Sequence, residues 1–167
     1  MIYGIRIREI GVNEFVVTCR DLPECTFTSR DVPTALADAA KAIPGTIELF
    51  YRQKKRAIPV STPIEEGEVP IFIPLRVQTK ILLWNTVVSQ GMNLTEFAER
   101  IGCSRTQAQR LVDFSKSASP ENIEKALAEL GCIFDVTVEP EPKNNWRTQL
   151  SNCEPSSCCG DTVEDET

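Results

Sequence analysis

The sequence contains no histidine among its 167 residues. Histidine is the commonest general base and metal ligand, so its absence excludes Ser-His and Cys-His nucleophiles and mixed Cys/His zinc sites. No run of about 18 apolar residues occurs, so no transmembrane helix is expected. The start, MIYGIRIREI, also lacks the features of a signal peptide. We therefore expect a cytoplasmic protein with no membrane partner, no cofactor and no metal site.

The seven cysteines are predicted to remain free thiols, because a reducing cytosol disfavours disulfides. Cys153, Cys158 and Cys159 follow a Cys-x4-Cys-Cys spacing, which fits neither a zinc knuckle nor a zinc ribbon. The other four fall at predicted core positions, where cysteine acts as a small apolar filler. These four are Cys19, Cys25, Cys103 and Cys132.

The charge is unevenly distributed along the chain. The net charge is −6, yet residues 75–118 contain six basic and three acidic side chains. The flanking segments are acidic, most strongly in residues 119–140 and 141–167. An acidic protein can still bind nucleic acid through a local basic patch. Residues 75–118 are therefore the segment in which we look for such a patch.

The first part of the chain predicts a β-β-β-α-β module over residues 1–74. Apolar and polar residues alternate in 2–10, which is typical of a half-buried strand, and further strands are predicted at 15–22 and 25–29. A helix capped by Asp31 follows. Pro44-Gly45 interrupts it, so we expect a kinked or restarted helix that reaches about Lys55.

A last strand is predicted at Val69–Ile73. Pro70 and Pro74 favour an edge position for it, because proline cannot donate a ladder hydrogen bond. The run RQKKR at 52–56 fits the solvated end of the preceding helix, where cations complement the helix dipole. Contact with RNA or with a partner protein is the alternative for this run.

The second part, residues 75–140, predicts a mainly helical module. Helices are expected from Leu75 to Gly91 and from Ser119 to Gly131, and the alternating segment 132–140 is predicted to be a strand. A lone strand in a helical module has no partner in its own chain, so we expect it to pair with the same strand of a second subunit. Residues 141–167 are polar and acidic and are predicted to be a largely disordered tail.

The most regular stretch is LTEFAERIGCSRTQAQRLV, residues 94–112. It predicts two short helices with a turn at Gly102, where glycine adopts a positive φ without steric cost. Ser104 is the expected cap of the second helix. The side chains expected on the inner faces are Phe97, Ala98, Ile101, Ala108 and Leu111. This arrangement is typical of a helix-turn-helix that places its second helix in the major groove.

The outward face of this second helix contains polar and basic side chains. Glutamine suits adenine and arginine suits guanine in the major groove. The candidate DNA-binding residues are Ser104, Arg105, Thr106, Gln107, Gln109 and Arg110. The alternative is an ordinary pair of helices with a solvated polar face.

The two parts together resemble the HicB antitoxin family. The resemblance rests on DLPECTFTSRDVPTALADAAKAI, IFIPL and KILLWN, followed by the helix-turn-helix, and it covers about residues 1–138. Glu24 stands where the family usually has glycine. The resemblance implies an α+β fold: a truncated RNase H-like module at 1–74, then a helix-turn-helix domain with a C-terminal dimerising strand.

What the resemblance implies about function is an antitoxin. It would neutralise a small mRNA-cleaving toxin of the HicA type and bind operator double-stranded DNA, as a homodimer or homotetramer, to repress its own operon. The tail at 141–167 lies outside the resemblance. It motivates an alternative, a stand-alone phage- or prophage-type regulator without a toxin partner.

A minimal nuclease is a third possibility, and the carboxylates do not favour it. The acids of the first module lack a spacing that specifies a two-metal site. They fit solvated loop charges. The alternative is that some of them pair with a basic toxin. These acids are Glu9, Glu14, Asp21, Glu24 and Asp31. We expect no enzymatic activity.

Overall fold

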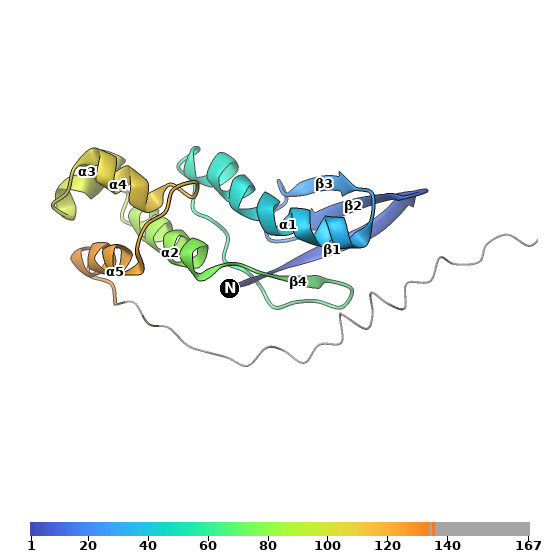
Figure 1. Cartoon of the computed structure of the whole chain (residues 1–167). Helices are drawn as coiled ribbons and strands as arrows, with labels where there is room; N and C mark the ends of the chain where they lie inside the picture. The colour runs from blue at the N-terminus through green and yellow to red at the C-terminus, as the bar shows by residue number, and fades with distance from the viewer. Residues whose placement is uncertain (134, 136–167) are drawn as a thin grey trace, which may run out of the picture. The chain divides into compact units, whose positions relative to one another are not determined.

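The computed structural model describes residues 1–133 and 135, which belong to one compact unit. The chain begins with an antiparallel sheet of four strands in the order β3-β2-β1-β4 (Figure 1). The strands are β1 (Ile2–Gly11), β2 (Glu14–Cys19), β3 (Thr26–Ser29) and β4 (Val69–Phe72). The prediction of a mixed fold with strands at the N-terminus is therefore confirmed, and so is the edge position of β4.

The register of the sheet separates an apolar face from a polar one. Ile5 pairs with Cys19 and Ile7 with Val17, so these side chains share one face. Helix α1 packs against the sheet and covers this face (Figure 1). Arg6 and the other polar residues that alternate with the apolar ones stay exposed on the opposite face.

Helix α1 (Val32–Thr46) begins where predicted. The Asp31 carboxylate accepts a hydrogen bond from the Thr34 backbone N–H at 2.7 Å. Pro44 lies inside α1, and the helical segment continues past it, as predicted. The continuation is a wider π-helix, η1 (Ile47–Arg52), which was not predicted. Proline removes one helical hydrogen bond, and the π-helix begins three residues after it.

The long connection from η1 to β4 is held down by hydrogen bonds. The side-chain amide of Asn85 pairs with both the N–H and the C=O of Ile58, at 2.7 and 2.8 Å. The indole N–H of Trp84 donates to the Arg56 carbonyl at 2.8 Å, and the Tyr3 hydroxyl donates to the Pro59 carbonyl at 2.6 Å. This connection is therefore part of the packed structure although it forms no helix or strand.

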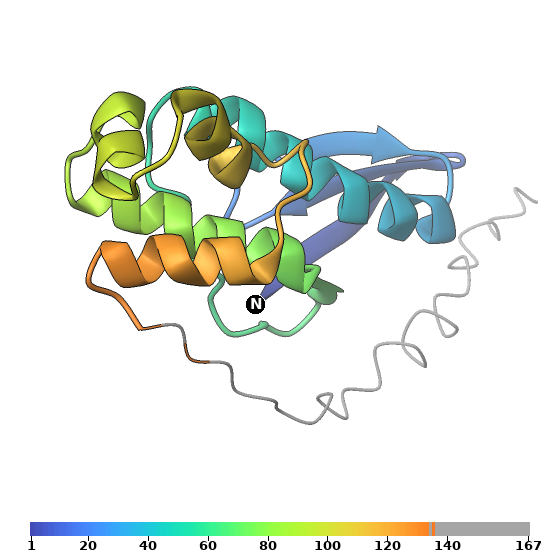
Figure 2. The same ribbon diagram turned by 60° about the vertical axis from the view of Figure 1, so that its left-hand side comes forward.

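Four helices follow the sheet: α2 (Leu75–Ser89), α3 (Leu94–Arg100), α4 (Arg105–Val112) and α5 (Pro120–Glu129). Helix α2 is central, and both α4 and α5 pack against it (Figures 1 and 2). Gly131, with φ of +77°, follows the end of α5 as predicted. No described helix is both long and apolar enough to span a membrane.

Several predictions concern residues beyond this part of the chain. Most of the dimerising strand at 132–140 lies outside the described residues, and the tail at 141–167 lies wholly outside them. The boundary between the two modules at residue 74 stays a prediction. The apolar core runs on from the sheet into the helices, and the residues on either side of that boundary, Ile73 and Val77, are both buried in it.

Candidate nucleic-acid interface

A tight turn at Gly102 sets the angle between α3 and α4. The Gly102 N–H donates to the Glu99 carbonyl at 3.2 Å, and the Cys103 N–H donates to the Ala98 carbonyl at 3.0 Å. These two bonds close α3 in a Schellman motif. Gly102 has φ of +65°, as predicted, and a Cβ there would meet no other atom within 4 Å. The backbone conformation, not lack of space, is therefore what requires glycine.

The inner surfaces of α3 and α4 are apolar. Phe97, Ala98, Ala108 and Val112 are buried, and the predicted pair Ile101 and Leu111 pack partly buried against the same core. Val112 was not among the predicted inner residues. With Ala108 and Val112 fixed against the core one turn apart, α4 turns its opposite side to solvent.

Helix α4 begins at a capping box formed by two of the predicted DNA-binding residues. Ser104 Oγ accepts from the Gln107 backbone N–H at 3.2 Å, and Gln107 Oε1 accepts from the Ser104 backbone N–H at 3.0 Å. Ser104 was expected to cap, but the reciprocal role of Gln107 was not. The spacing Ser-x-x-Gln at the start of a helix is the signal that predicts it. Both side chains therefore hold the first turn of α4.

All six predicted DNA-binding residues are exposed, but they do not form one uniform set. A groove of about 530 Å³ lies between α4 and α5, and Gln107 and Arg110 line it together with Asn122 and Lys125 of α5. Arg105 and Gln109 do not line it. They are one turn apart and share a different side of α4. The outward surface of α4 therefore has two sides, which meet near Arg110.

The basic segment presents fewer charges than the sequence indicates. Lys80 is only 2% exposed, so it adds nothing to the surface of residues 75–118. The remaining basic residues of the segment are exposed; they are Arg76, Arg100, Arg105, Arg110 and Lys116. The count of six basic residues therefore overstated the exposed basic charge of this segment by one.

The acids of the first module do not converge. Within the described part of the chain, no group of three His, Cys, Asp or Glu side chains is arranged to hold a metal ion. Asp21 accepts hydrogen bonds from the backbone N–H and the hydroxyl of Thr62, at 3.0 and 2.7 Å. Asp31 caps α1, while Glu9 and Glu14 are exposed. This distribution offers no scaffold for two-metal chemistry.

Glu24 binds the end of the π-helix. It accepts a hydrogen bond of 2.5 Å from the Tyr51 hydroxyl and forms an ion pair with Arg56 at 3.3 Å. Burial and this carboxylate together raise the pKa of Tyr51 to about 12. The hydrogen bond from Tyr51 in turn lowers the pKa of Glu24. Arg52 pairs with Glu48, so part of the basic run 52–56 is neutralised by neighbouring acids.

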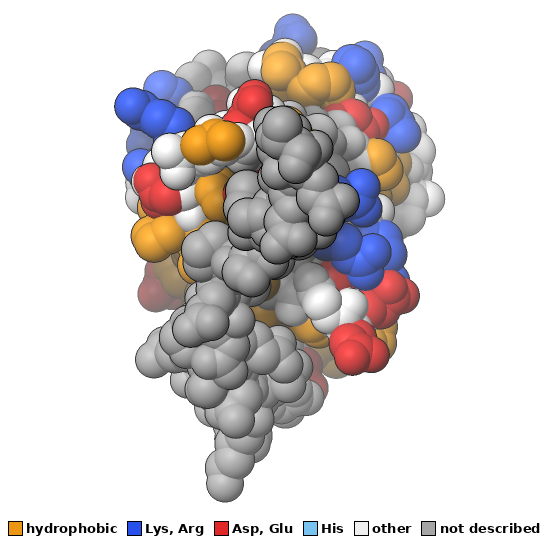
Figure 3. Space-filling view, turned by 90° about the vertical axis from the view of Figure 1, so that its right-hand side faces the viewer, with side chains coloured by type: hydrophobic (Ala, Val, Ile, Leu, Met, Phe, Trp, Pro, Cys, Tyr) orange, Lys and Arg blue, Asp and Glu red, His pale blue; other side chains and the backbone are white. Residues whose placement is uncertain are grey.

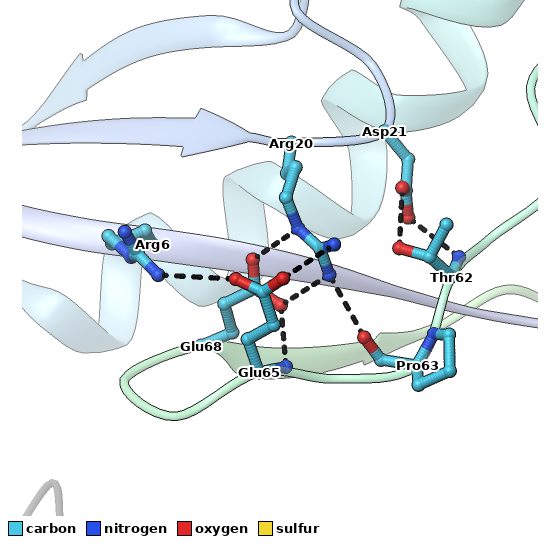
Figure 4. A network of polar contacts seen from close by, with 7 residues as sticks. All are labelled: Arg6, Arg20, Asp21, Thr62, Pro63, Glu65 and Glu68. Carbon is cyan, nitrogen blue, oxygen red and sulfur yellow. Dashed lines mark hydrogen bonds and ion pairs between the residues drawn. The ribbon is translucent and has the colours of Figure 1, made fainter.

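A second polar network fixes the 57–68 connection to the sheet (Figure 4). Arg20 Nε and Nη2 donate to the two carboxylate oxygens of Glu68, at 3.0 and 3.1 Å, and Arg20 also pairs with Glu65 at 2.9 Å. The Glu68 carboxylate lies directly over Gly4, where a Cβ would come within 2.4 Å of Oε2. On the face of the molecule shown in Figure 3, basic and acidic side chains are interspersed.

Comparison with known proteins agrees with the resemblance. Residues 3–82 match a family described as the HicB_like antitoxin of bacterial toxin-antitoxin systems. Antitoxin HicB of Pseudomonas fluorescens (strain Pf0-1) is 32% identical over 124 residues, which cover 74% of this chain and 84% of that protein. Antitoxin HicB of Escherichia coli (strain K12) is 25% identical over 131 residues, covering 78% and 94%. The chain therefore belongs to the HicB family of antitoxins.

Proposed function

We propose that this antitoxin acts through two surfaces. Residues 1–74 bind and neutralise a small HicA-type mRNA-cleaving toxin. Helix α4, in a helix-turn-helix formed with α3, binds operator DNA and represses the operon. Membership of the HicB family supports the antitoxin role, and the geometry of α3 and α4 supports the DNA-binding role.

The observation that carries the DNA-binding proposal is the exposure of α4. This short, capped helix buries Ala108 and Val112 and leaves Arg105, Gln109 and Arg110 exposed. Arginine and glutamine make the commonest bidentate contacts to guanine and adenine in the major groove. The turn at Gly102 holds α4 at an angle to α3, as a recognition helix requires.

A second subunit completes this proposal. The predicted strand at 132–140 would join two chains, and a two-fold dimer places two α4 helices on one face of the duplex. The half-sites of a palindromic operator should then lie about 34–36 Å apart, or a multiple of that distance. The test is titration of a labelled duplex from upstream of the gene at low salt. Saturable binding by a dimer or tetramer supports the repressor role, and absence of binding contradicts it.

The toxin-binding proposal assigns the sheet and α1 to a truncated RNase H-like module. Its test is co-expression with the neighbouring gene, if that gene encodes a small basic protein. Rescue of growth, with co-purification of the two proteins, supports neutralisation. Lack of rescue, combined with operator binding, would instead favour a stand-alone regulator.

A further inference from the structure

Lys80 is a buried ammonium group inside the helical half of the chain. It extends from α2 and donates hydrogen bonds to three backbone carbonyls, those of Arg110 at 3.0 Å, Asp113 at 2.6 Å and Lys116 at 2.8 Å. A lysine has three N–H donors, so all of them are used. Among the described residues no carboxylate lies within ion-pair distance of Lys80. The three carbonyls are therefore its direct hydrogen-bond partners.

These carbonyls belong to the end of α4 and the turn after it. The last four carbonyls of a helix have no partner inside the helix and form the negative end of its dipole. Helix α4 ends at Val112, and the residue after it, Asp113, has φ of −82° and ψ of 113°, which give no glycine-type cap. The Asp113 carbonyl also accepts from the Lys116 backbone N–H at 3.1 Å. Lys80 adds a donor from α2 to that carbonyl and to the Arg110 carbonyl, so the end of α4 is tied both to its own turn and to α2.

A second contact holds the same turn from the other half of the chain. Glu48 of the π-helix η1 accepts a hydrogen bond from the Phe114 backbone N–H at 3.1 Å. The same carboxylate pairs with Arg52, which keeps it in place. Lys80 and Glu48 therefore hold residues 110–116 by hydrogen bonds to backbone groups. We call this pair of side chains the α4 clamp.

The groups around Lys80 shift its pKa in both directions, with burial the largest effect. Burial lowers its pKa, while the carboxylates of Asp113 and Glu48 act in the opposite direction. Arg76 and Arg110 lower it further. The three carbonyls also favour the charged form, because hydrogen bonding to a charged group stabilises it.

We propose that the α4 clamp positions α4 for reading DNA, and that Lys80 is its principal residue. An apolar side chain fills a core at less cost than a buried charge, so a lysine here is explained better by the geometry it imposes than by stability. The clamp sets the direction in which Arg105, Gln109 and Arg110 project. This inference rests on the proposed DNA-binding function.

The test compares operator DNA with random DNA of equal length, using the full chain. Lys80→Met removes the ammonium and keeps an unbranched side chain. The operator-over-random affinity ratio should fall at least fivefold. Random-DNA affinity and its salt dependence should change less than twofold, because Lys80 touches no phosphate. Thr79→Val is the matched control: Thr79 is equally buried in α2, at 1%, and its hydroxyl bonds within α2.

A retained ratio in folded Lys80→Met overturns the proposal, and so does an equal fall in Thr79→Val. If Lys80→Met does not fold, Glu48→Ala tests the other side of the clamp, where an unchanged ratio also overturns it. If the wild-type chain binds no operator, the proposed function fails separately. Amide hydrogen exchange then decides: faster exchange at 110–116 in Lys80→Met, but not in Thr79→Val, supports the clamp, and unchanged exchange contradicts it.

Discussion

Gly102 is the residue on which the angle between α3 and α4 depends, and the sequence alone predicted its positive φ. Lys80 shows where such residue-level reasoning stops. Its neighbours Val77, Ile81 and Trp84 lie on the buried face of α2, so the helical period placed Lys80 beside that face. The carbonyls that satisfy it come from residues 30 to 36 positions later in the chain. No local pattern connects residues so far apart.

Replacing Gly102 with valine should destabilise the protein by about 1–3 kcal/mol, because a β-branched residue resists a φ of +65°. Urea unfolding measures the effect. Gly45→Ala is the control, since its added Cβ meets nothing within 4 Å and lies in a helix. That change should stabilise by about 0.5–1 kcal/mol. Equal stability of Gly102→Val and wild type would contradict the role of the turn.

The Glu68 carboxylate should make stability depend on acid pH. Burial raises its pKa, but the hydrogen bonds from Arg20 and the Glu65 backbone N–H, together with the charges of Arg20 and Arg6, outweigh this, so its pKa lies below the ordinary 4.5. Its contribution is therefore complete above about pH 4.5 and is lost as pH falls through the lowered pKa. Glu68→Gln should lose about 1–3 kcal/mol at pH 7. The loss should shrink as the pH falls through the lowered pKa, because the wild-type carboxylate then takes up a proton.

Urea midpoints of both proteins at pH 7, 5 and 3 measure this difference. Glu66→Gln is a suitable control, because Glu66 is an exposed acid in the same connection. A constant difference between Glu68→Gln and wild type across this range would show that the ion pair with Arg20 contributes no pH dependence.

Helices and strands were predicted with nearly their observed limits wherever periodicity and caps agreed. Asp31, Ser104 and Ser119 each cap the helix that they were expected to cap. Around Pro44 the helix was predicted to continue, and it does, although its change to a π-helix at Ile47 was not predicted. Ile43, Ile47 and Tyr51 are all buried on the core side of this segment. Burial of this row favours a continued helix despite the proline.

The capping box of α4 gives a prediction for one element. Ser104→Ala should destabilise the chain by about 1 kcal/mol, because the Gln107 N–H loses its acceptor. Thermal unfolding followed by circular dichroism measures it. Thr106→Ala is the control, since Thr106 is exposed in the same first turn. A similar small change in both variants would mean that the box adds no stability.

At the scale of the whole molecule, the sequence predicted the order of the parts, and the family comparison supports the antitoxin identity. The sequence predicted less well which charged side chains reach the surface. Net charge along the chain cannot distinguish a buried lysine from an exposed arginine, so Lys80 was counted in the basic patch. The surviving exposed set, with Arg105 and Arg110 on α4, is where DNA affinity should originate.

The most direct measurement is the salt dependence of operator affinity for wild type, Arg105→Ala and Arg110→Ala, by fluorescence anisotropy. Arg8→Ala is the matched control, because Arg8 is exposed on the sheet, away from α4. We expect both α4 variants to weaken binding at least tenfold, and each lost phosphate contact to reduce the salt slope by about one unit. Unchanged affinity in both, or an equal loss in Arg8→Ala, would contradict the assignment of α4 as the DNA-reading helix.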